Sequence, residues 1–132
     1  IRDRVDMVTF DGAGGGSGYS PCKMMNEWCL PTVVMESILY GILDKLAAEG
    51  MELPDVAITG GFATEDQVYK ALALGADAVL IARPFVTAVY GAGADGVATY
   101  TAQLGNELAD TMRLCGAPTL DAITRDMVRV IK

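Results

Sequence analysis

The sequence predicts an α/β fold in which parallel strands are covered by helices. Short β-branched runs alternate with amphipathic helical segments, and each run stops at a glycine or a turn residue. The runs themselves are almost continuously apolar, as in strands that are buried on both faces. Strands joined through a helix pair in parallel by right-handed crossovers. A closed barrel and an open doubly wound sheet both satisfy this order.

The first two predicted strands enclose a glycine-rich segment and a helix. A strand over residues 5–10 ends at the segment 12–18, in which five of seven residues are glycine. A helix opens at Pro31 and ends at Gly50, and a second strand follows over residues 55–59. We expect the buried face of that helix to carry the apolar residues at helical spacing, which are Val34, Ile38, Leu39, Ile42, Leu43 and Leu46.

The next unit has clear boundary signals. Thr64 and Gln67 form a capping-box pattern, which predicts a helix that runs to Leu74. Gly75 is expected as a left-handed C-cap, and a third buried strand is predicted over residues 77–81. Strand, helix and strand therefore follow one another with short connections.

The last third of the chain is predicted to be mostly helical. Pro84 can initiate a helix, a short apolar stretch leads to the glycine-rich segment 91–96, and a long helix then continues until Gly116 and Pro118. Residues 119–123 predict one more capped turn. One face of the long helix is expected to carry Val97, Tyr100, Leu104, Leu108, Met112 and Cys115.

Composition excludes several classes of function. A net charge of −7 argues against nucleic acid and anionic membranes as partners, because both require clustered Lys and Arg. No stretch supplies the ~20 apolar residues of a membrane-spanning helix, and no secretory signal is recognisable, so we expect a cytoplasmic protein. The chain has no His and three irregularly spaced Cys, so no metal site and no imidazole base are expected.

The predicted strand ends indicate where a ligand binds. In parallel α/β folds the ligand meets the carboxyl ends of the strands, and all three ends here carry glycine or a turn. A phosphate in a barrel is commonly held by the loops after the last two strands and by the N-terminus of a short extra helix. The parts that would form such a site are Gly60, Gly61, Ala82 and Arg83, followed by Pro84.

The same residues belong to motifs that resemble a known family. The first third of the chain resembles the sixth strand and loop of the FMN-binding domain of glutamate synthase and its stand-alone relatives, through residues 11–18, 24–28 and 30–32. The remainder resembles strands seven and eight of that domain, through residues 58–62, 64–66, 71–76 and 82–84. This second set also recurs in FMN-dependent 2-hydroxy acid dehydrogenases and in type 2 isopentenyl diphosphate isomerase.

The resemblance implies a fold and a set of roles. Residues 1–132 would be the C-terminal portion, strands 6–8, of a single (β/α)₈ TIM-barrel domain with FMN as cofactor. Backbone groups of Gly60, Gly61, Ala82 and Arg83 would hold the FMN phosphate, with the Arg83 side chain as an additional charge partner. Near the flavin ring would lie Gly14, Gly15 and Gly16, and the substrate loop would add Asp11, Ser17 and Gly18. No residue is assigned as the catalytic acid.

The implied activity is that of a glutamate synthase-like FMN oxidoreductase, which reduces an imine such as 2-iminoglutarate to the amino acid. Alternatives are an isomerase-like or other FMN reductase, and a non-catalytic barrel fragment. Hydroxy acid dehydrogenases place a His and an Arg after strand six, and this chain has Asp11 and Gly12 there, so we expect that branch less. Glutamate synthase has an iron–sulfur cysteine cluster after strand eight, which residues 85–96 lack, so electrons are expected from another donor protein.

Three βα units do not close a barrel, which needs about eight strands. We therefore expect the chain to be truncated at its N-terminus, or to pair with a missing barrel half or with copies of itself. Taken alone, such a fragment is expected to be inactive. Its partner in the intact protein would be a small-molecule substrate.

Overall fold

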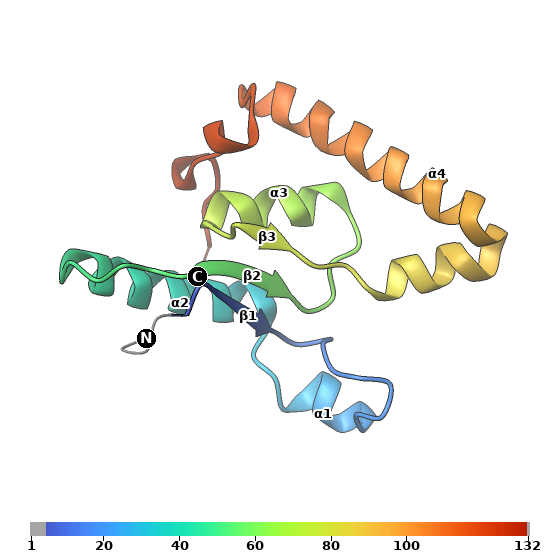
Figure 1. The fold of residues 1–132 in the computed structure, drawn as a ribbon, viewed down its shortest axis with the longest axis horizontal. Coiled ribbons are helices and arrows are strands. Elements are labelled where there is room, and N and C mark those ends of the chain that lie inside the picture. Colours follow the sequence, from blue (N-terminus) through green and yellow to red (C-terminus); the bar gives the residue numbers. More distant parts are fainter. Residues whose placement is uncertain (1–4, 132) are drawn as a thin grey trace.

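Three parallel strands and the helices that follow them form the framework of the molecule. The computed structural model describes residues 5–131 (Figure 1). Its strands are β1 (Met7–Asp11), β2 (Asp55–Thr59) and β3 (Ala78–Val79), paired in that order. Its helices are α1 (Cys22–Glu27), α2 (Thr32–Ala48), α3 (Glu65–Leu74) and α4 (Arg83–Cys115), followed by 3₁₀ turns at Leu120–Ala122 and Arg125–Met127. The predicted α/β order is therefore confirmed.

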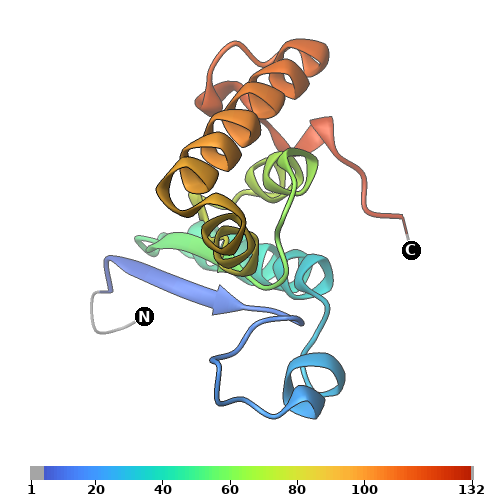
Figure 2. The same ribbon diagram turned by 90° about the vertical axis from the view of Figure 1, so that its right-hand side faces the viewer.

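The core lies between β2 and the two helices α2 and α3. Val56 and Ile58 of β2 are buried against Leu39 and Leu43 of α2, with Ala71 of α3 in the same cluster. Figure 2 shows α2 and α3 on one side of the sheet, with α4 crossing beyond α3. A second cluster joins α3 to the C-terminal turns, through Tyr69, Ala73, Ala117 and Ile123.

Local signals at the ends of α3 act as predicted. The Thr64 N–H donates to Oε1 of Gln67 at 3.3 Å, which satisfies one of the free amides at the start of the helix. Gly75 ends the helix with φ 115°, a left-handed conformation that favours glycine. These two caps fix the helix between β2 and β3.

The structure corrects the predicted face of α2. Leu39 and Leu43 are buried, but Val34, Ile38 and Ile42 are 43%, 52% and 49% exposed. The helix is apolar on two faces, and periodicity alone cannot tell which face the sheet covers. No described residue covers the second face.

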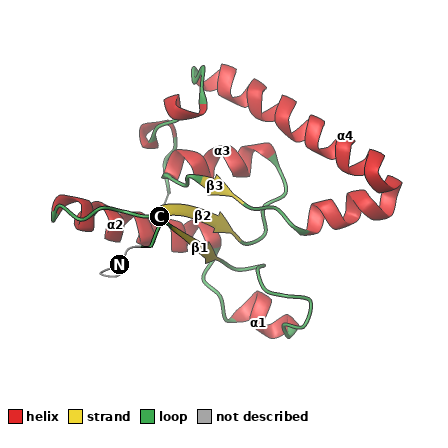
Figure 3. Ribbon diagram, viewed as in Figure 1, coloured by secondary structure: helices red, strands yellow, loops and turns green. Residues whose placement is uncertain are grey.

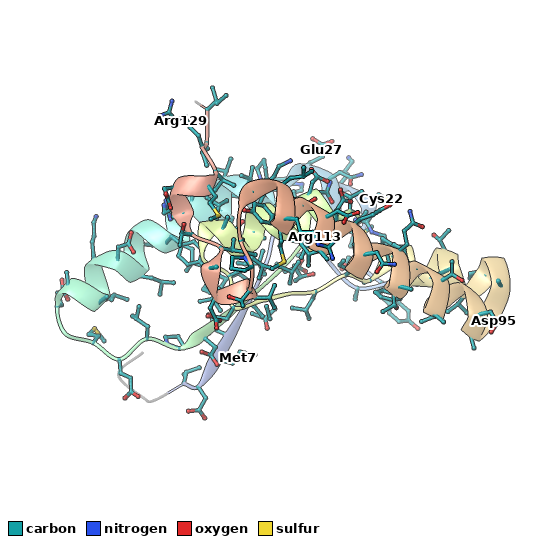
Figure 4. All side chains as sticks on the ribbon, turned by 90° about the horizontal axis from the view of Figure 1, so that it is seen from above. Met7, Cys22, Glu27, Asp95, Arg113 and Arg129 are labelled. Atoms are coloured by element: carbon teal, nitrogen blue, oxygen red, sulfur yellow. The ribbon has the colours of Figure 1, made fainter. Side chains whose placement is uncertain are left out.

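Two predicted strands also differ from the structure. The first was predicted to be buried, but along β1 exposed residues alternate with half-buried ones; Met7, labelled in Figure 4, is 54% exposed. Successive side chains of a strand point to opposite faces, and among the described residues only one face of β1 is covered. The third shortens from residues 77–81 to the two residues of β3. The side chain of Asp77 instead accepts the Val56 N–H at 2.7 Å, which replaces one ladder bond.

The glycine-rich segment 91–96 contains the break between the two helical arms of α4, as predicted. α4 begins at Arg83 and is broken at Ala92 and Gly93, where Gly93 has φ 57° and ψ −134°. Only glycine adopts that conformation readily, so the bend is specified by the sequence. Figure 4 shows Asp95 at this bend, and the second arm folds back toward α3 (Figure 1). The short helix α1, which lies inside the loop after β1, was not predicted.

Candidate functional site

The carboxyl ends of the strands meet at one edge of the sheet. Asp11 of β1 lies opposite Thr59 of β2, and the Gly12 N–H donates to the Thr59 carbonyl at 2.9 Å. On the other side of β2, the Leu80 N–H donates to the Ile58 carbonyl at 2.9 Å. The loops that follow the strands therefore converge at this edge, as Figure 3 shows in green.

The first two loops touch at a junction that admits only glycine. Gly60 has φ 121°, and a Cβ added to it would lie 2.7 Å from the Gly12 nitrogen and 2.7 Å from Oγ1 of Thr32. The Thr32 hydroxyl, in the first turn of α2, donates to the Gly60 carbonyl at 2.7 Å. This packing brings the start of α2 and both loops into one rigid corner.

The glycine-rich loop is folded back on the end of β1. The Gly16 N–H donates to Oδ2 of Asp11 at 2.9 Å, and the Gly14 N–H donates to the carbonyl of Met25 in α1 at 2.9 Å. Oδ1 of Asp11 would lie 1.8 Å from a Cβ added to Gly15, so a side chain at that position would displace the Asp11 carboxylate. The loop lies beside the tip of β2, because a Cβ added to Gly14 would be 3.4 Å from the Cα of Gly61.

Arg83 joins the third strand end to this loop. Its Nη2 donates to the Gly14 carbonyl at 2.6 Å, across 69 positions of sequence. Arg83 is also the first residue of α4, and Pro84 stands in the first turn as predicted. The structure thus places the three strand tips in one group.

A cavity of about 1040 Å³ opens at this edge. Every residue predicted for the site lines it, namely Asp11, Gly14, Gly15, Gly16, Ser17, Gly18, Gly60, Gly61, Ala82 and Arg83. Among the described residues along its wall, the charged ones are Asp11 and Arg83. The rest of the lining is mostly glycine, alanine and threonine, so a ligand can approach the main chain closely.

The backbone N–H groups of Gly60, Gly61, Ala82 and Arg83 have no hydrogen-bond partner within the described chain. Free amides at a strand tip and at a helix start attract anions. The guanidinium of Arg83 adds a positive charge and keeps N–H groups beyond the one that binds Gly14. The donor set therefore fits a phosphate ester such as the one in FMN.

The second arm of α4 forms a cavity wall that was not predicted as part of the site. Tyr100 lines the cavity, donates its hydroxyl to the Ala63 carbonyl at 2.8 Å and packs edge-to-face on Phe85, with ring centroids 4.9 Å apart. Partial burial raises the pKa of Tyr100, so the phenol stays neutral. In the sequence, Tyr100 belongs to the apolar stripe of the helix, which predicted a packing role only. The bend at Gly93 turns Tyr100 toward the site.

Two further observations concern metals and membranes. Within residues 5–131 no group of three or more His, Cys, Asp or Glu side chains could hold a metal ion. None of the described helices combines the length and apolarity that crossing a bilayer requires.

Comparison with known proteins identifies the family. Residues 37–130 match the model of the FMN-dependent dehydrogenases. Peroxisomal (S)-2-hydroxyacid oxidase GLO3 of Arabidopsis thaliana is 49% identical over 130 residues, which cover 98% of this chain and 31% of that protein. Archaeal glutamate synthase [NADPH] of Archaeoglobus fulgidus is 33% identical over 90 residues, which cover 67% of this chain and 17% of that protein. The chain thus spans about a third or less of the length of these relatives.

The fold has a counterpart among solved structures. A flavocytochrome b2 variant with bound sulfite superposes with a TM-score of 0.76 at 23% sequence identity, covering 93% of this chain and 29% of that one. At this identity the likeness concerns the fold alone. It agrees with the predicted partial barrel.

The relatives favour the branch that the sequence motifs made us expect less. The absence of His led us to place 2-hydroxy acid enzymes behind glutamate synthase, but the hydroxyacid oxidase matches at higher identity and over more of the chain. The expected cofactor, FMN, is confirmed at the level of the family. With 94 of its residues covered by the family model (37 to 130), the chain belongs to the FMN-dependent dehydrogenases.

Proposed function

We propose that the edge formed by the three strand tips binds the phosphate of FMN. The observation that carries this proposal is the set of unpartnered N–H groups on Gly60, Gly61, Ala82 and Arg83, within the part of the chain that the structure describes. Their amides and the Arg83 guanidinium would hold the phosphate, and the glycine-rich loop would face the flavin ring. When bound, FMN supplies redox chemistry at its N5 atom, and the protein supplies position and electrostatics.

For the substrate we propose a small organic acid that is an imine, such as 2-iminoglutarate, which the intact protein reduces to the amino acid. The loop after β1 supports this choice, because it carries glycines and Asp11 and the whole sequence contains no His. Removing the hydroxyl proton of a 2-hydroxy acid needs a positioned base, most often His. An imine carbon can accept hydride without such a base.

The second candidate is oxidation of a 2-hydroxy acid, favoured by the 49% and 40% identities to the hydroxyacid oxidases GLO3 and GLO4 of Arabidopsis thaliana. Two assays on the flavin-loaded protein separate the candidates. With the flavin chemically reduced beforehand as the electron source, formation of glutamate from ammonia and 2-oxoglutarate supports imine reduction. Bleaching of the flavin absorbance by glycolate without oxygen supports hydroxy acid oxidation. A chain that takes up no FMN would instead support the hypothesis that it is a non-catalytic barrel fragment.

We also propose that these three βα units are part of a closed (β/α)₈ barrel whose other units come from further chain or from another subunit. The free edge of β1 and the coverage of 29% of the flavocytochrome b2 variant support this. Electrons would come from a separate donor protein, since residues 85–96 carry no cysteine. A cytoplasmic location also stays a prediction, because GLO3 and GLO4 are described as peroxisomal.

Gly61→Asp is expected to weaken FMN binding by at least about 100-fold. Two like charges about 4 Å apart in a partly buried site repel by several kcal/mol, and the new carboxylate would stand beside the phosphate. The backbone at Gly61 has φ 85°, and the nearest atom to an added Cβ is the Ala13 carbonyl oxygen at 3.5 Å, so there is room for the side chain. Titration of flavin fluorescence measures the affinity.

Gly61→Asn is the matched control, since Asn has nearly the same shape as Asp and tolerates the left-handed region equally well. It should weaken FMN binding only by a few fold. Equal affinity for FMN in the Asp variant and the unmodified protein would refute the phosphate site.

A further inference from the structure

Two charged side chains hold the glycine-rich loop from opposite sides. Oδ2 of Asp11, at the end of β1, accepts the Gly16 N–H at 2.9 Å. Nη2 of Arg83, at the start of α4, donates to the Gly14 carbonyl at 2.6 Å. Both bonds are charge-assisted, and such bonds are roughly twice as strong as neutral ones.

The loop needs these bonds because its own sequence does not select a conformation. Gly14 and Gly16 have φ values of 85° and 109°, and glycine loses more conformational freedom on ordering than any other residue. Asp11 also fills the space beside Gly15, where its Oδ1 lies 1.8 Å from the position of a Cβ. The carboxylate is therefore packed into the loop as well as bonded to it.

We propose that Asp11 and Arg83 are positioning residues, which hold the glycine-rich loop in one conformation over the strand tips before any ligand binds. That this loop forms the substrate-facing wall rests on the proposed function. The Asp11 carboxylate then acts as a hydrogen-bond acceptor for Gly16 and not as the base of the reaction. Arg83 links the loop to the phosphate site, because the same residue carries one of the free amides.

The experiment is amide hydrogen exchange over residues 13–17 of the full chain, measured by mass spectrometry without flavin and again with added FMN. In Asp11→Ala we expect exchange in this segment to become about tenfold faster, the effect of losing one hydrogen bond to a charged group. Asp11→Asn should restore protection, because its amide oxygen can still accept the Gly16 N–H. Arg83→Met should also accelerate exchange, and it serves as the second variant if Asp11→Ala does not fold.

Ser17→Ala is the control within the same loop. The Ser17 N–H, which bonds Oγ of Ser20 at 3.0 Å, stays in place in this variant, so exchange at Gly16 should not change. Unchanged exchange in Asp11→Ala and Arg83→Met would overturn the proposal. Equal acceleration in Asp11→Asn and Asp11→Ala would overturn the acceptor role of Asp11.

The outcome can be separated from that of the proposed function. If the unmodified chain takes up no FMN, the phosphate site fails, while the exchange data without flavin still decide whether the loop is held. If it takes up FMN, the proposed phosphate site is supported, and the exchange measured without flavin still decides the loop proposal separately.

Discussion

Gly60→Ala is expected to destabilise the protein by roughly 3 to 5 kcal/mol, the combined effect of overpacking and of a backbone conformation that alanine adopts poorly. The new methyl would lie 2.7 Å from the Gly12 nitrogen and 2.9 Å from its carbonyl carbon, and both are backbone atoms that cannot swing away. With φ at 121°, the residue is also in the region that disfavours side chains. Urea unfolding followed by circular dichroism measures the difference.

Gly41→Ala provides the comparison for Gly60→Ala. Gly41 lies within α2, and nothing is found within 4 Å of a Cβ added to it. Alanine should stabilise the helix by about 1 kcal/mol at such a position. If the two variants unfold at the same urea concentration, the corner formed by Gly60, Gly12 and Thr32 does not have the tight packing described above.

The second large effect is on the pH dependence of stability and comes from Glu36, a residue of α2 that is only 2% exposed. Within the described chain its Oε1 has no hydrogen-bond partner, and neither has the buried hydroxyl of Tyr40 one turn later. Burial raises the pKa of Glu36 to about 7, although Arg125 partly opposes the shift. Burial raises the pKa of Tyr40 as well, and the nearby negative charges of Glu36 and Asp77 add to this shift. The Arg125 guanidinium lies 6.0 Å from the centre of the Tyr40 ring.

The pKa of Glu36 makes stability fall as the pH rises. The folded pKa of about 7 exceeds the ordinary value of 4.5, so the folded protein binds this proton more tightly than the unfolded chain does. The free energy of unfolding therefore decreases between about pH 4.5 and pH 7, by about 3 kcal/mol in total for this group. Below that window the carboxyl is neutral in the folded and the unfolded state, so the penalty for burying its charge is absent.

Glu36→Met is expected to remove this loss, so the difference in stability between the variant and the unmodified protein should shift by about 2.5 kcal/mol in favour of the variant between pH 5 and pH 8. Denaturant unfolding of both proteins at the two pH values tests this, and other titrating groups cancel in the comparison. Glu36→Gln is the matched control: it should lose the same pH dependence but keep a buried polar group. A stability difference that does not change with pH would contradict the raised pKa.

The carboxyl ends of the strands could be located from sequence because parallel strands place them at the same edge, whatever the rest of the fold does. The caps of α3 and the start of α4 depend on neighbouring residues and were equally predictable. The hydrogen bond from Arg83 to Gly14 could not be predicted from the sequence, because it joins distant segments and depends on the path of a glycine-rich loop. Burial of Glu36 was not predicted either, because the apolar spacing of α2 indicated a different inward face.

The outward ridge of α2 also affects how the chain behaves at high concentration. Val34, Ile38 and Ile42 follow one another at one-turn spacing, and no strand among residues 5–131 pairs with the outer edge of β1. Apolar ridges and open strand edges are the surfaces through which proteins self-associate. Solubility of this polypeptide therefore depends on how well that flank is shielded, and the net charge of −7 is the main repulsion that keeps copies apart.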